Sequence, residues 1–107
     1  MTLDEWLRTR TPPAPPALQA RVVTALGASG QSGADDAPER FLGAAETLVE
    51  ELLRDPGGGR AHALDLLAVD ALVTYAFEAA AEQPETLARR AVEAMVRLAQ
   101  CGQDARP

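Results

Sequence analysis

The segment from about residue 60 to residue 82 constrains the fold most, because it reads as a long helix with an unusually wide apolar face. Gly57 to Gly59 break the chain before it, and Pro84 follows it. At about 100° per residue the apolar side chains sweep an arc of about 220°, roughly twice the stripe of an ordinary surface helix. The arc contains Leu64, Leu66, Ala68, Val69, Leu72, Val73, Tyr75, Ala76, Phe77, Ala79 and Ala80. A face of this width needs neighbours on at least two sides.

Four other segments also show helical patterns. Thr2 and Glu5 form a capping box that begins a short helix within residues 2–10. Apolar residues at helical spacing predict three further helices, at about 16–26, 36–55 and 85–101. The sequence shows neither a strand pattern nor an internal repeat. The predicted fold class is therefore all-α, a small antiparallel bundle of four main helices plus a short N-terminal helix.

The helix predicted at 85–101 is amphipathic. Its apolar stripe contains Leu87, Ala91, Met95 and Leu98. Such a stripe is typical of a helix that packs against a core, and we expect it to cover part of the wide face at 60–82.

The connections between the helices have distinctive compositions. Four prolines make residues 11–16 a stiff spacer that ends by starting a helix. Residues 27–35 are rich in Gly and Ser and have almost nothing to bury, so we expect a flexible loop. Gly102 is expected to stop the last helix and leave a disordered tail at 103–107. Residues 1–107 are predicted to form a single helical domain.

The charge composition argues against several classes of ligand. The net charge is −6, and all the basic side chains are arginines scattered along the chain, so a nucleic-acid partner is not expected. Acidic residues interrupt the longest apolar stretch, which argues against a membrane span. A single Cys and the lack of a signal-peptide pattern at the N-terminus indicate a cytoplasmic protein. The Ala- and Arg-rich usage suggests a bacterial source.

Asp65 is the anomaly of the long helix, because its direction lies near the middle of the apolar arc. An ionised carboxylate there would be costly without a partner. We expect it to reach solvent, free amides at the helix start, or an arginine such as Arg89 or Arg90. The alternative is a carboxylate that binds a ligand or a proton.

Two pairs of possible metal ligands have spacings that can bind metal in helical bundles. His62 and Asp65 form a His-x-x-Asp pair, and Glu46 and Glu50 form a Glu-x-x-x-Glu pair. The usual Glu-x-x-His pair is absent, so we predict no metal and no cofactor, and these four residues remain candidates only under an alternative hypothesis. The one His and one Cys lack a third catalytic partner, and we predict no enzyme.

The wide apolar face also allows a protein partner. Small side chains permit close helix approach, so part of the arc is a candidate homodimer interface. The candidate interaction residues are Asp65, Ala68, Leu72, Ala76, Ala79 and Ala80.

One segment of the long helix resembles a known family. Residues 66–78 read Leu-Leu-Ala-Val-Asp-Ala-Leu-Val-Thr-Tyr-Ala-Phe-Glu, which resembles the trans-polyprenyl diphosphate synthase helix Leu-Ala-Gly-Asp-Ala-Leu-Leu-Thr-x-Ala-Phe-Glu, with Val69 in place of its glycine. Asp35 and Asp36 resemble, more faintly, the family's aspartate-rich metal motif, without its following basic residues and without a second aspartate motif. The family's active site needs a chain about three times longer. The resemblance therefore implies at most a remnant or a noncatalytic partner of such a synthase.

These observations favour a small noncatalytic protein that acts in protein–protein interaction or regulation, either with another protein or as a homodimer. The alternatives are a helical bundle that binds a small ligand or metal, and a noncatalytic partner of a prenyl synthase.

Overall fold

The computed structural model describes residues 1–55 and 57–104, without the side chains of residues 85–87 and 102–104. The elements are α1 (Leu3–Arg8), α2 (Pro16–Leu26), the 3-10 helices η1 (Gly27–Gln31) and η2 (Ala34–Asp36), α3 (Ala37–Arg54), α4 (Arg60–Ala81) and α5 (Pro84–Asp104). No strand occurs among these residues, apart from an isolated bridge between Thr2 and Gly33. The predicted all-α fold is confirmed.

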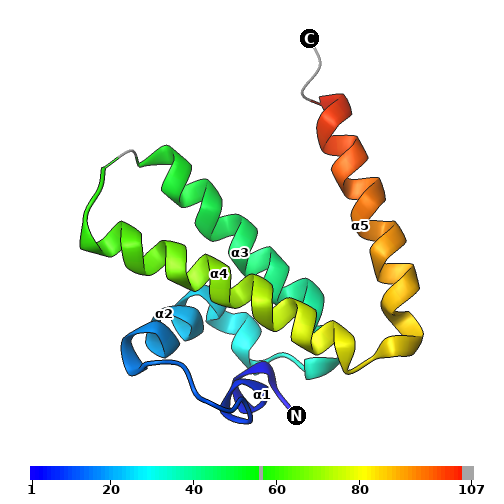
Figure 1. Ribbon diagram of the computed structural model, residues 1–107, viewed down its shortest axis with the longest axis horizontal. Helices are drawn as coiled ribbons and strands as arrows, with labels where there is room; N and C mark the ends of the chain where they lie inside the picture. Colours follow the sequence, from blue (N-terminus) through cyan, green and yellow to red (C-terminus); the bar gives the residue numbers. More distant parts are fainter. Residues whose placement is uncertain (56, 105–107) are drawn as a thin grey trace.

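The centre of the fold is an antiparallel hairpin of α3 and α4 (Figure 1). The helix α2 packs on both of these helices, and α1 lies below them near the end of α4. None of the described helices combines the length and apolarity that a membrane span requires.

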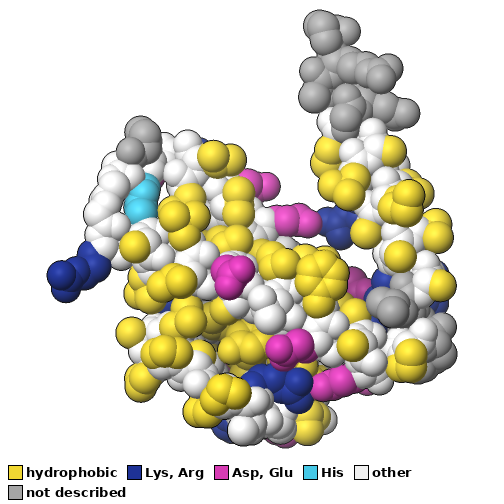
Figure 2. Space-filling view, in the orientation of Figure 1, with side chains coloured by type: hydrophobic (Ala, Val, Ile, Leu, Met, Phe, Trp, Pro, Cys, Tyr) yellow, Lys and Arg dark blue, Asp and Glu magenta, His cyan; other side chains and the backbone are white. Residues whose placement is uncertain are grey.

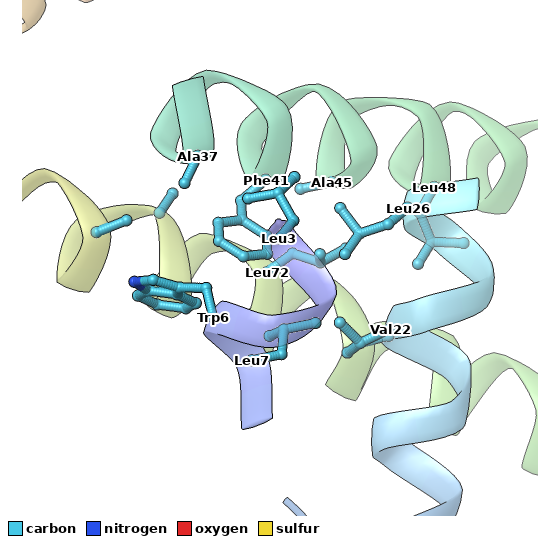
Figure 3. Packing of buried hydrophobic residues seen from close by; sticks show 13 residues of the cluster. Leu3, Trp6, Leu7, Val22, Leu26, Ala37, Phe41, Ala45, Leu48 and Leu72 are labelled. Carbon is cyan, nitrogen blue, oxygen red and sulfur yellow. The ribbon is translucent and has the colours of Figure 1, made fainter. Parts of the chain in front are cut away.

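The core lies where α1 and α2 meet the hairpin (Figure 3). Its largest fully buried side chains are Phe41 on α3, Leu3 on α1, Leu72 on α4 and Val22 on α2. Alanines on the inner faces of α3 and α4 are also buried, and their small side chains allow the two helices to approach closely. Much of the wide face of α4 thus serves contacts within the chain.

The helix α1 is held in place by aromatic contacts. Thr2 caps it by accepting a hydrogen bond from the amide of Glu5 at 3.2 Å, as the sequence predicts. The ring of Trp6 lies 5.2 Å from that of Phe41 and 5.9 Å from that of Tyr75. Its indole N–H also donates a hydrogen bond of 2.9 Å to Glu82 Oε2 just after α4. Trp6 therefore joins the first helix to the far end of the fourth.

Residues 27–34 lie within the loop at 27–35 that the composition predicts to be flexible. They form η1 and the start of η2 and pair with the N-terminal segment through their backbone. The amide of Leu3 donates to the carbonyl of Ser32 at 3.0 Å, and that of Ala34 donates to the carbonyl of Met1 at 2.9 Å. Backbone groups make these contacts, so a scarcity of apolar side chains does not prevent them.

The wide arc expected to be buried on α4 is only partly covered. Leu66 and Phe77 belong to it, yet both side chains are largely exposed. The reason is that α1, α2 and α3 gather on the alanine side of α4. The helix α5 lies on the Phe77 part of the other side but leaves this side chain 71% exposed.

The helix α5 does not pack as expected, because most of its predicted core stripe is not covered by the rest of the fold. It extends to Asp104, beyond the predicted stop at Gly102, and residues 105–107 of the expected tail lie outside the described residues. Ala91, Met95 and Leu98 of its predicted core stripe are exposed, and the side chain of Leu87 is not among those described. The helix leaves the end of α4 and points away from the rest of the fold (Figure 1). The helices α2 and α3 already cover most of the alanine face of α4.

Candidate interaction surface

Asp65 has a charged partner, but not one of those expected. Its Oδ1 accepts a hydrogen bond of 2.6 Å from Nε of Arg21 on α2, and both side chains are partly buried. The packing of α2 against α4 brings these residues together from 44 positions apart. The expected partners Arg89 and Arg90 instead lie on α5 and pair with Glu93 and Glu39. The charge on Asp65 is thereby balanced within the chain.

The four candidate metal ligands are not gathered into one site. His62 Nε2 lies 3.5 Å from Asp55 Oδ2, and Glu46 Oε1 accepts from Arg97 at 2.8 Å. Glu50 is exposed on α3. Among the described residues, no group of three or more His, Cys, Asp or Glu side chains is placed to hold a metal ion.

The candidate interaction residues of α4 are placed inside the fold. Their buried members are Ala68, Leu72, Ala76, Ala79 and Ala80. Ala68, Leu72, Ala76 and Ala79 belong to the core cluster, so these side chains serve contacts within the chain. Ala76 and Ala80 also line an open groove beside α5, so these two lie beside an accessible surface.

An open apolar groove lies between α5 and the α3–α4 hairpin. It has a volume of about 210 Å³. Leu42 of α3, Phe77 and Ala80 of α4, and Ala91 and Ala94 of α5 are among the residues that line it. We call this cavity the α5 groove. Figure 2 shows the gap between the two parts and the apolar side chains on both sides of it.

Two ion pairs connect α5 to α3 across this gap. Arg90 Nε lies 2.9 Å from Glu39 Oε1, and Arg97 donates a hydrogen bond of 2.8 Å to Glu46. The two arginines are seven residues apart, as are the two glutamates, so the pairs repeat after two helical turns. These long side chains bridge the helices, and an open groove takes the place of the interdigitated apolar contact usual between packed helices.

A row of large apolar side chains on α5 is uncovered. Val92, Met95 and Leu98 are 61%, 69% and 72% exposed, respectively. They follow at intervals of three, which places them along one side of the helix, and we call them the α5 stripe. Phe77, at the α5 groove, is 71% exposed. The amphipathic pattern of α5 is visible in the sequence, but no sequence signal shows that its apolar side lacks a cover.

The surroundings of Tyr75 alter its ionisation. Burial, followed by the nearby charge of Glu78, raises the pKa of its hydroxyl above the ordinary value of 10.0. The group is neutral at physiological pH. Its ring packs against Trp6 and Phe41, so its role is in the core.

No protein-family model, curated protein or solved structure matches this chain. No whole-protein family is therefore recognised. The resemblance to the prenyl synthase helix stays confined to residues 66–78, in the middle of α4.

Proposed function

We propose that the protein is a noncatalytic helical interaction protein that binds another protein through the α5 stripe and the α5 groove. The observation that supports this most directly is the exposure of Val92, Met95 and Leu98 on a helix directed away from the core. Contiguous apolar surface on a protein in water marks interaction sites more often than scattered single residues do.

The energetics favour a partner for this helix. Complete burial of one large apolar side chain contributes about 1.5–3 kcal/mol, and the α5 stripe offers three such side chains on one helix face. Anchors at such helical intervals are the usual means by which an amphipathic helix is recognised. A rigid helix that already presents its anchors loses little conformational entropy on binding.

The size of the α5 groove favours a protein side chain over a small-molecule ligand. Its volume of about 210 Å³ is below the roughly 300–1,000 Å³ typical of small-molecule pockets. The metal alternative is less favoured, because Asp65 and His62 each have a charged partner within the chain. A prenyl synthase as the partner, and a bacterial cytoplasm as the location, stay predictions.

Site-specific photocrosslinking in the host cell tests this function. A photoreactive residue at Met95 is expected to give discrete protein adducts, and the additional change Leu98→Glu is expected to abolish them. The matched control is the same photoreactive residue at Leu53, which is 79% exposed in the last turn of α3 and does not line the α5 groove. Identical adducts at both positions, or none at Met95, would contradict the proposal.

A further inference from the structure

We propose that the partner is a second copy of this chain, with the α5 stripe of each copy packed against the mouth of the other copy's α5 groove at Phe77. This inference rests on the proposed function and names the partner of that surface. It differs from a dimer through the whole alanine face of α4, because Ala68 and Ala79 are buried and do not line the α5 groove.

One chain carries both halves of a helix-in-groove contact. The α5 stripe is the helix half, with large side chains at regular helical intervals. The α5 groove is the receiving half, and α5 cannot fill it because Ala91 and Ala94 of that helix form one of its walls. The stripe residues Val92, Met95 and Leu98 are not among the residues that line it. An identical second molecule supplies a groove for the α5 stripe of the first molecule and a stripe for its α5 groove.

The volume of the α5 groove suits side chains of the α5 stripe. An apolar cavity of about 150 Å³ holds a molecule of benzene. The α5 groove, at about 210 Å³, therefore has room for the end of a Met or Leu side chain. Its open mouth at Phe77 extends that apolar contact.

The exposed apolar area reaches the range that a specific interface needs. At about 150 Å² for a fully exposed large apolar side chain, the exposed fractions leave roughly 500 Å² on each copy. This sum covers Phe77, Val92, Met95, Val96 and Leu98. Two copies thus supply about 1,000 Å², the lower bound for a specific interface, before the exposed alanines of α5 are added.

The charges beside the two halves are complementary. Arg89 is an exposed basic residue on α5 close to Val92 in sequence, with only a surface pair to Glu93 at 3.7 Å. Asp70 and Glu78 are exposed acidic residues on α4, seven and one positions from Phe77, and Glu78 has a surface pair to Arg10 at 3.7 Å. Packing of the α5 stripe against the partner's Phe77 brings Arg89 toward these acidic residues. Because the second copy does the same in return, the contact closes into a two-fold dimer without open surfaces for further growth.

Sedimentation equilibrium of the full chain tests the dimer. At about 100 µM the unaltered protein is expected to have the mass of a dimer, and Met95→Glu or Phe77→Glu is expected to raise the dissociation constant at least about tenfold. Leu53→Glu is the matched control, since it makes the same kind of change on an exposed apolar residue outside the surface, and it is expected to leave the dimer intact. Both test residues are exposed, and an unchanged circular dichroism spectrum verifies the fold.

A mixture of the two variants tests the arrangement itself. Met95→Glu retains an intact groove mouth and Phe77→Glu retains an intact stripe, so the mixture can form one of the two reciprocal contacts. Native mass spectrometry is expected to show a mixed dimer more abundant than either variant homodimer. A Phe77→Glu protein that dimerises like the unaltered chain would show pairing of α5 with α5 and overturn the arrangement.

The outcomes also separate this inference from the proposed function. A monomer at about 100 µM, combined with Met95 crosslinks to a different protein, overturns the second-copy partner and leaves the interaction function standing. A monomer with no discrete adducts at Met95 overturns both. If Leu53→Glu raises the dissociation constant of the dimer as much as Met95→Glu does, the α5 stripe has no special part in the contact.

Discussion

Replacement of each of the two phenylalanines by alanine makes a direct test of the fold. Both lie on helices, and the sequence pattern alone places both on apolar faces. In the structure Phe41 is fully buried, whereas Phe77 is 71% exposed. The same chemical change should therefore have very different effects at the two positions.

The expected loss of stability at Phe41 is large. Truncation of a buried Phe to Ala costs about 3–5 kcal/mol, which includes the cavity left behind. Phe41 also loses ring contacts to Trp6 at 5.2 Å and to Tyr75 at 5.8 Å. A domain of this size has a free energy of unfolding of about 5–15 kcal/mol, so the change removes a large part of it. Phe77→Ala should alter stability by no more than about 0.5 kcal/mol.

Urea unfolding at low protein concentration measures both changes. With a slope of about 1.5 kcal/mol per M, Phe41→Ala should lower the midpoint by about 2–3 M and Phe77→Ala by well under 1 M. Fluorescence of Trp6, the single tryptophan, reports on the aromatic contacts, and circular dichroism reports on the helices. Coincident transitions would support a two-state analysis.

Low concentration matters because dimer formation through Phe77 would add a concentration-dependent term to the apparent stability. A loss of several kcal/mol for Phe77→Ala under monomeric conditions would show that Phe77 is buried within the chain and refute the placement of α5. A small loss for Phe41→Ala would refute the position of the core.

Three further predictions concern individual groups. Burial raises the folded-state pKa of Tyr75, so the stability that this group contributes is fully present below the unfolded pKa near 10.0 and is lost as pH rises through the folded pKa. The tyrosinate absorbance of this single tyrosine should therefore titrate above pH 10.0. Tyr75→Phe should reduce the loss of stability at alkaline pH. Asp65→Ala and Arg21→Ala should each lower the free energy of unfolding by about 1–2 kcal/mol, because each leaves a partly buried charge unpaired. A double-mutant cycle measured by urea unfolding should give a favourable coupling energy between the two residues. Additive losses of stability would contradict the ion pair. Gly27 has φ +53°, a backbone conformation that favours glycine, although a Cβ at this position would meet no neighbour. Gly27→Ala should therefore lower the free energy of unfolding by about 1–2 kcal/mol through backbone strain. An unchanged thermal midpoint would refute this backbone conformation.

Much of the secondary structure follows from local features of the sequence. Thr2 caps α1, Pro16 occupies the first position of α2, and Pro38 and Glu39 lie in the first turn of α3, as their chemistry predicts. The glycines after Pro56 separate α3 from α4 at the predicted place. These features act over one helical turn, so they can be read without knowledge of the fold.

Parts of the candidate site were not predictable in the same way. Helical periodicity correctly groups Phe41, Ala45 and Leu48 on one face, and the structure buries all three. The same reasoning grouped Met95 and Leu98 of α5, which the structure leaves exposed. A period states which side chains share a face, but it does not state whether another element covers that face.

The amino-acid pattern alone was enough to predict an all-helical protein, the ends of its helices to within a few residues, and the residues that share an apolar side. The contact between Arg21 and Asp65, the burial of most α4 alanines in the chain's own core, and the outward direction of α5 became known only from the packing of the helices. These two kinds of feature differ in the range of the interactions that produce them. Helix caps and backbone dihedrals depend on residues within one helical turn, whereas burial depends on which helices, distant in sequence, pack against a given face.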